Sequence, residues 1–172
     1  MTDSYTPTKK AVKATINLGD IPIDVYQLPD GSYQLYMESI TDAIAQENKD
    51  LLRFINGKSE QALPFKGYKL IDAPTIEEEE QLYIKAVPVR LAAAYWFYRA
   101  IKGNKKAAAI AGACMEESIE RRADKAFSLQ RTDAEYNKRF TERKEEILRE
   151  NREEIIDRRL PGDDWYFPDG IN

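Results

Sequence analysis

The chain has 172 residues, of which 42% are hydrophobic and 33% are charged, and its formal net charge is −4. This size suits one domain, or a small domain with a helical arm, and supplies enough apolar side chains for a core. The negative charge is unlike that of a protein that coats duplex DNA, which is usually basic, although a local basic patch can still bind phosphate.

The absence of histidine restricts function most strongly, and Cys114 is the single cysteine. Without histidine, the commonest general base, the Ser-His and Cys-His pairs and most zinc sites are excluded. The sequence also has no phosphate-binding glycine loop and no nucleophile motif. Cys114 lies in the apolar run AIAGACM, which is typical of a buried side chain and not of a reactive thiol. We therefore predict that the protein is not an enzyme and holds no cofactor or metal.

Two groups of carboxylates could be proposed as metal sites, but neither pattern favours a metal. One recurs at helical spacing, but four nearby cations can satisfy it and helical metal sites usually add histidine. Its members are Glu116, Glu117, Glu120 and Asp124. The second has no metal-nuclease spacing, and its members are Asp20, Asp24, Asp30 and Glu38.

No apolar run approaches the roughly 18 residues that a membrane-spanning helix needs, so we expect no membrane contact. The amino-terminal residues MTDSYTPTKK lack the apolar stretch of a signal peptide. A lone cysteine allows no disulfide within the chain, which favours a reducing, cytoplasmic location.

Residues 11–37 alternate between apolar and polar side chains in the runs AVKATINL, IPIDVYQL and SYQLYM. This period of two predicts strands, and the turn residues Gly19-Asp20 and Pro29-Asp30-Gly31 separate them. We expect a three-stranded antiparallel meander, which needs a helix on one face for stability.

Residues 38–58 change to helical spacing, with a break near 46–48 and a C-cap at Asn56-Gly57. This pattern predicts two short helices in a helix-turn-helix outline. The second helix would present three cations to a phosphate backbone, namely Lys49, Arg53 and Lys58. An ordinary helix pair remains the alternative, because acidic residues outnumber cations here.

Residues 59–81 are irregular and include the glutamate run 77–80. Two short stretches, 67–71 and 81–87, are strand candidates, and the sequence leaves open whether they join the first sheet. Pro88 then begins a helix, and Gly103-Asn104 separates it from a second helix that runs to Phe127, with Ile110, Cys114 and Ile119 directed inward.

This helical hairpin carries a second set of candidate phosphate contacts, at its turn and at its far end. They are Lys102, Lys105, Lys106, Arg121 and Arg122. A solvated surface with intrahelical ion pairs is the alternative interpretation.

Thr132 and Glu135 form an N-cap signature for a third helix, which runs to about Leu160 with balanced charge and few apolar positions. Such a long, polar helix is expected to lie across a partner or extend from the body. The tail PGDDWYFPDGIN then docks on the same subunit or on a neighbouring one. Our candidate oligomer or partner contacts are Tyr136, Phe140, Ile147, Trp165, Tyr166 and Phe167.

The β-meander followed by a helix pair is similar to the amino-terminal domains of phage antirepressor-type proteins, the Bro-N and KilA-N class. The run YWFYRAIKGNKKAAAIAGACMEESIERRADKAF, residues 95–127, resembles a helical segment of uncharacterised bacterial proteins of mobile-element type. Together the resemblances span about residues 15–130, and they imply a DNA-associated regulator that is often oligomeric.

The sequence therefore predicts an α+β fold, with a small amino-terminal antiparallel β-meander and a helix-turn-helix-like pair, then a helical hairpin and a long polar C-terminal helix. The expected units are 11–71, 82–160 and the aromatic tail 161–172. Our first functional hypothesis is a DNA-binding regulatory or accessory protein of a phage or mobile element. The alternative is a non-enzymatic protein-protein interaction or assembly module, an adaptor or inhibitor acting through the C-terminal helix and tail. A homo-oligomer, most simply a two-fold dimer, is expected in either case.

Overall fold

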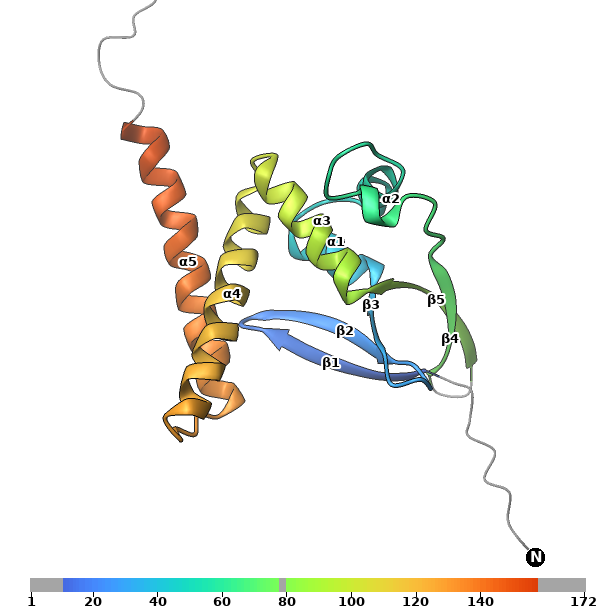
Figure 1. Ribbon diagram of the computed structural model, residues 1–172, viewed down its shortest axis with the longest axis horizontal. Helices are drawn as coiled ribbons and strands as arrows, with labels where there is room; N and C mark the ends of the chain where they lie inside the picture. The colour runs from blue at the N-terminus through green and yellow to red at the C-terminus, as the bar shows by residue number, and fades with distance from the viewer. Residues whose placement is uncertain (1–10, 78–79, 158–172) are drawn as a thin grey trace, which may run out of the picture.

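An antiparallel sheet runs through the molecule, and helices pack against it and extend to one side (Figure 1). The computed structural model describes residues 11–77 and 80–157. In chain order the sheet strands are β1 (Val12–Leu18), β2 (Ile21–Gln27), β3 (Tyr33–Tyr36), β4 (Ile71–Glu77) and β5 (Glu80–Pro88). The helices are α1 (Met37–Ala43), α2 (Asn48–Ile55), α3 (Val89–Ile101), α4 (Lys105–Ala126) and α5 (Asp133–Asp157), with a 3-10 turn at η1 (Leu63–Phe65). The predicted α+β class is confirmed.

The strand order in the sheet is β1-β2-β3-β5-β4, and every neighbouring pair is antiparallel. The first three strands form the predicted meander. Of the two strand candidates, 81–87 lies within β5, which pairs with β3 through Leu35 and Val87. The candidate at 67–71 is wrong except at Ile71, because β4 begins there, runs to Glu77 through the stretch expected to be irregular, and pairs with β5. The sheet thus includes a strand from the beginning of the second predicted unit, while the division into units itself stays a prediction.

The helix α3 holds the core together because its inner face contacts both the sheet and the first helix pair. Leu91, Ala92 and Tyr95 are buried in the same apolar cluster as the sheet residue Leu35. The indole N–H of Trp96 donates a hydrogen bond of 2.9 Å to the backbone carbonyl of Ile40 in α1. This bond ties α3 to α1 in a region from which water is excluded.

The turn between α3 and α4 is fixed by one residue, Asn104. Its side-chain oxygen accepts a hydrogen bond of 2.9 Å from the Ala107 amide, which caps α4. Its side-chain nitrogen donates a bond of 3.0 Å to the Ile44 carbonyl at the end of α1. Gly103 adopts a φ of +90° and allows the chain to reverse before the cap.

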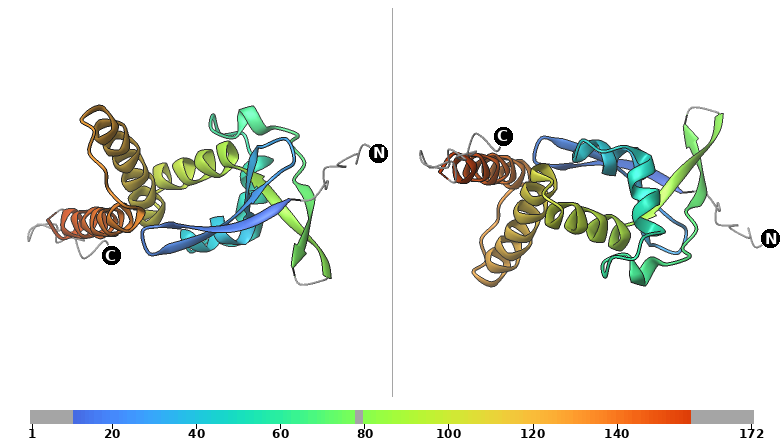
Figure 2. Two further views of the ribbon diagram at one scale, coloured as in Figure 1. Left: turned by 90° about the horizontal axis from the view of Figure 1, so that it is seen from below. Right: turned by 90° about the horizontal axis from the view of Figure 1, so that it is seen from above.

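The last helix, α5, lies along α4, and the tip of the β1–β2 hairpin lies beside it (Figure 2). The predicted cap is confirmed, because the Thr132 hydroxyl accepts a hydrogen bond from the Glu135 amide. The Gly19 amide donates to the side-chain oxygen of Asn137 at 3.3 Å. The ammonium of Lys144, which is buried, forms an ion pair with Asp20 and lowers the pKa of that carboxyl. Two residues of one tight turn therefore hold α5 against the sheet.

We predict that Gly19→Ala destabilises the protein by about 2–4 kcal/mol, because it combines a left-handed backbone with a steric clash. Gly19 has a φ of +65°, and a Cβ there would lie 2.6 Å from the Thr141 hydroxyl oxygen and 2.7 Å from Phe140 Cδ1. Urea unfolding gives the free energy difference. The matched control is Gly31→Ala, which has a φ of +82° and no atom within 4 Å of the added Cβ. It should cost only about 1 kcal/mol, and equal losses for the two variants would contradict the docking of this turn.

Candidate functional site

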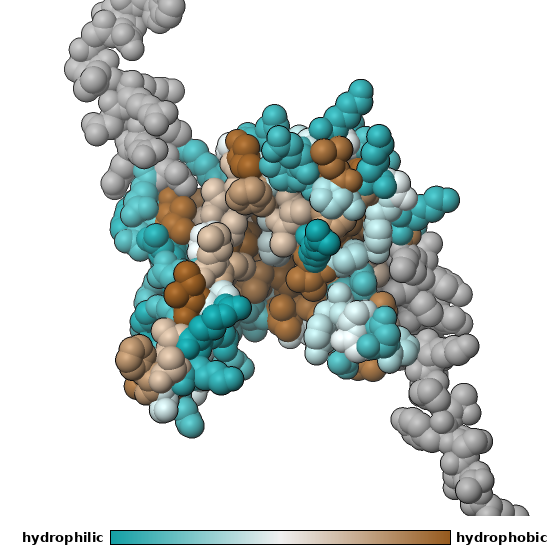
Figure 3. Space-filling model, in the orientation of Figure 1, coloured by the Kyte–Doolittle hydropathy of each residue, from teal (hydrophilic) through white to brown (hydrophobic). Residues whose placement is uncertain are grey.

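An apolar groove of about 720 Å³ lies between the face of β1, β2 and β3 and the helices α3 and α4. Figure 3 shows apolar side chains gathered in a hollow whose surroundings are largely hydrophilic. The floor comes from the sheet and the two walls come from the helices. Its size and its almost wholly apolar lining make the groove the candidate functional site.

The floor is apolar because the register of the hairpins places apolar residues opposite one another. Ile16 faces Ile23, and Val25 faces Leu35. Directly opposed residues project from the same face of an antiparallel sheet. Strand alternation therefore produces a continuous apolar surface across the three strands, of which α3 covers only a part.

Each wall is lined by a pair of consecutive residues together with the small residues one turn before them on the same helix. Trp96 and Phe97 of α3 line one side, and Cys114 and Met115 of α4 line the other. The small residue Ala111 keeps the α4 wall low. Ile119 follows Met115 by one helical turn and is 65% exposed, so the apolar stripe continues along α4 beyond the groove.

The position of Ile119 corrects a prediction, since the sequence analysis directed it inward with Ile110. Ile110 is buried, but nine residues at 100° each place Ile119 on the opposite side of α4. The two isoleucines therefore cannot share one face of the helix.

The groove is open to solvent, and large apolar side chains form its edge. Phe97 is 54% exposed and Met115 is 66% exposed, and Ile16, Tyr33 and Val89 are also exposed. Single exposed apolar residues are common, but a contiguous set around a hollow marks an interaction surface. A bound apolar group would therefore remove a substantial unfavourable surface from water.

The polar atoms that line the groove are already occupied or uncharged. The Trp96 indole N–H is bound to the Ile40 carbonyl, and the Tyr33 hydroxyl accepts a bond of 3.4 Å from the Gln27 side chain. Burial raises the pKa of the Cys114 thiol to about 11, so this group stays protonated at neutral pH. The groove thus offers shape and apolar contact, without a charged group to orient a polar ligand.

The cations predicted on α2 lie beside acidic residues. Lys49 pairs with Glu47, and Arg53 lies 3.3 Å from Asp50, while Lys58 is exposed after the helix. Glu47 and Asp50 also form the capping box at the start of α2. A helix that reads DNA presents its first residues to the groove of the duplex. Here Glu47 and Asp50 place two carboxylates beside Lys49 in that turn, and the carboxylates repel phosphate.

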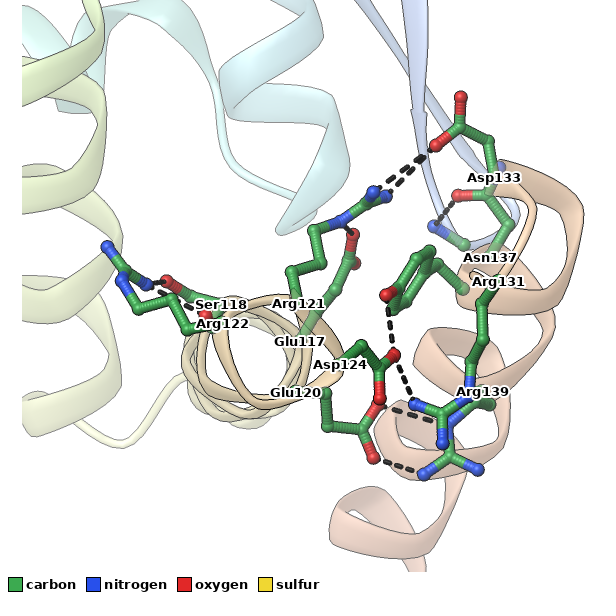
Figure 4. Close-up of polar contacts among 12 residues, drawn as sticks. Glu117, Ser118, Glu120, Arg121, Arg122, Asp124, Arg131, Asp133, Asn137 and Arg139 are labelled. Carbon is green, nitrogen blue, oxygen red and sulfur yellow. Dashed lines mark hydrogen bonds and ion pairs between the residues drawn. The ribbon is translucent and has the colours of Figure 1, made fainter. Parts of the chain in front are cut away.

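The predicted cations of the hairpin fall into two separate groups. Lys102, Lys105 and Lys106 flank Asn104 and so lie at the α3–α4 turn, next to the α1–α2 turn. Arg121 and Arg122 lie about 24 Å further along α4, by the rise per residue of a helix. Figure 4 shows that Arg121 bonds Glu117 and Asp133, and that Arg122 bonds Ser118. The structure therefore does not gather the five cations in one patch.

The ion pairs of Arg121 belong to a polar network that joins α4 to α5. Buried Asp124 accepts bonds of 2.6 Å from both Arg131 and the Tyr136 hydroxyl. The guanidinium of Arg121 lies 3.8 Å from the centre of the Tyr136 ring. Arg139 pairs with Glu120 on the same side. Tyr136 of α5 is therefore used within the chain.

Several residues proposed as partner contacts are accounted for by this packing. Tyr136 and Phe140 are buried against the chain's own elements, and half-buried Ile147 approaches Gly112 of α4. Trp165, Tyr166 and Phe167 lie outside the described residues.

A second hollow of about 460 Å³ is bordered by four of the chain's carboxylates, Asp20, Asp24, Glu38 and Asp42. Asp24 lies 3.3 Å from the Lys13 ammonium and accepts a 2.7 Å bond from Thr15, while Lys144 pairs with Asp20. Over 11–77 and 80–157, no group of three or more side chains of the metal-binding types is placed to hold an ion. Within the same residues, no helix combines the length and apolar character needed to cross a bilayer.

The groove was missed by the sequence analysis, which used the α3 residues only for helix packing. The signal was present in AAAYWFY, where apolar residues occupy the whole circumference of one helix. No protein-family model, curated protein or solved structure matches the chain. The resemblance to phage antirepressor-type domains therefore stays a prediction.

We predict that iodoacetamide alkylates Cys114 on the order of a hundredfold more slowly in the folded protein than in urea at about pH 8. The reason is that burial raises the pKa of this thiol to about 11. Mass spectrometry of the alkylated chain gives both rates, because the sequence has one cysteine. Equal rates would show that the α4 wall of the groove does not shield the thiol.

Proposed function

We propose that this protein is a protein-interaction module that holds an apolar segment of a partner protein in the groove between the sheet, α3 and α4. The observation that carries the proposal is the open, uncharged groove with exposed Phe97 and Met115 at its edge. This agrees with the adaptor or inhibitor alternative of the sequence analysis. The proposed contact surface moves from α5, whose residues Tyr136 and Phe140 are buried within the chain, to the opposite side of α4.

A protein segment suits the groove better than a small molecule does. Small-molecule sites usually add a few well-placed polar groups to an apolar pocket, and the polar atoms here are occupied. The apolar stripe also continues from Met115 to Ile119, beyond the hollow itself. An elongated apolar surface of this kind matches the binding of an amphipathic helix in a groove.

Met115→Asp should weaken partner binding about thirtyfold or more, because it replaces an apolar contact worth about 2 kcal/mol by a charge. The partner is first identified with a photoreactive phenylalanine at position 97 in cells that express the protein. Affinity is then measured with both purified proteins. Leu63→Asp is the matched control, since Leu63 is 55% exposed and lies in η1, outside the groove. Unchanged affinity for Met115→Asp would refute the proposal.

DNA binding is the second candidate, and it is favoured by the lysines of the α3–α4 turn. Lys102 and Lys106 are exposed there, and Asn104 holds this turn against the end of α1. A helix start with nearby lysines suits phosphate contact. This proposal places the phosphate contacts at the hairpin turn and not on α2, whose first residues are acidic.

The double variant Lys102→Glu with Lys106→Glu should lower the affinity for duplex DNA about tenfold or more at roughly 50 mM salt. Fluorescence anisotropy with random duplex measures the change, and binding should weaken steeply towards roughly 200 mM salt. The control changes the charge equally elsewhere, with Lys125→Glu and Lys138→Glu, both at exposed positions. Absence of DNA binding by the unmodified protein, or an equal loss in both double variants, would reject this candidate.

A further inference from the structure

We infer that the chain's own aromatic tail, Trp165 to Phe167, occupies the apolar groove of the same molecule and that a partner must displace it. This inference rests on the proposed function, because it takes the groove to be a binding site for apolar protein segments. The tail would then compete with a partner for that site and so regulate its binding.

The chemistry of the groove matches the tail. The groove offers an apolar sheet floor and two walls that carry Trp96 and Phe97 on one side and Met115 on the other. The sequence PGDDWYFPDGIN places three aromatic residues in succession. Flat aromatic rings gain much from apolar cover, and methionine adapts to them well.

The tail begins close enough to reach the groove. The Arg143 guanidinium lies 2.6 Å from the Glu116 carboxylate, and Ile147 approaches Gly112. This antiparallel pairing brings the end of α5 to the level of the start of α4, and Figure 1 shows the two helix ends apart at that level. From Asp157 to Trp165 the extended chain spans at most about 28 Å. Ala111 at the groove lies about 9 Å along α4 from its first residue, by the rise per residue of a helix. The tether is therefore long compared with the distance along α4 that separates its level from the groove.

Charge and turn chemistry support a route from the end of α5 to the groove. Pro161-Gly162 follows the last helix and favours a reversal of the chain. Asp163 and Asp164 come next, and the route passes the α3–α4 turn, where Lys102 and Lys106 are exposed. Opposite charges at the edge would orient the tail, while the aromatic residues supply apolar burial.

A tethered segment competes at a high effective concentration, typically millimolar for a short linker. The tail would therefore lower the apparent affinity of the groove for any partner segment. Removal of the tail from the groove would be the step that makes the binding site available.

The test uses full-length protein labelled with 5-fluorotryptophan, which gives one ¹⁹F signal for each of the two tryptophans, Trp96 and Trp165. Trp165→Phe assigns the signals. The Trp165 signal should differ from that of a free peptide of residues 158–172. It should return to the free-peptide position in Met115→Asp and keep its shift in the control Leu63→Asp. A free-peptide position in the unmodified protein would overturn the inference.

The shift of Trp165 should stay constant over about a hundredfold range of protein concentration, since docking within one molecule is independent of concentration. Loss of the shift on dilution would overturn the inference and identify a second copy as the occupant.

Replacing Trp165, Tyr166 and Phe167 by serine should raise the affinity for the crosslinked partner several-fold. If the Trp165 signal lies at the free-peptide position while Met115→Asp still weakens partner binding, the docking of the tail is rejected and the proposed function is kept. If the Trp165 signal is shifted while Met115→Asp leaves partner binding unchanged, the proposed function is rejected.

Discussion

Asn104 makes the two hydrogen bonds on which the placement of α4 depends. One of them caps the helix and the other holds the Ile44 carbonyl, so the start of α4 is fixed to the first helix pair. The remainder of α4 is held from behind by α5, which the β1–β2 turn secures through Gly19 and Asp20. Because the helix is supported at its start and back, the apolar space in front of it stays open.

The two sides of α4 differ in chemistry. The rear of α4 is joined to α5 by ion pairs and by buried Asp124, whereas its front carries Cys114, Met115 and Ile119. Polar networks with matched geometry fix one arrangement more specifically than apolar contacts do. The apolar front surface stays exposed to water, which is unfavourable, and a bound segment would remove that exposure. A rigid rear and an adaptable apolar front are suited to a helix that serves as one wall of a binding site.

Local sequence patterns were sufficient for the fold class and for most of the elements, and insufficient for the site. Alternation and turn residues predicted the meander, and the spacing of Pro88, Asn104 and Thr132 predicted three helices, because these signals act within a few residues. The contact between Gly19 and Asn137 joins residues far apart in sequence, and no periodicity specifies it. The groove arises from such distant contacts, so its residues looked like ordinary core positions. Lys144 was equally concealed, since its pattern is that of a surface lysine and its partner is in a distant turn.

The two functional proposals meet at the α3–α4 turn. The first residues of α2 are capped by Glu47 and Asp50, which stabilise the helix and at the same time repel a phosphate backbone. Among the predicted cations of the helical hairpin, Lys102 and Lys106 are the exposed ones at the turn that Asn104 holds against the end of α1, and the acidic residues Asp163 and Asp164 would pass the same lysines. Phosphate and the tail would then compete for one cationic edge, although only the tail has aromatic residues for the groove. An anion bound at this edge would release the tail, so DNA binding and partner binding would be positively coupled in the same molecule.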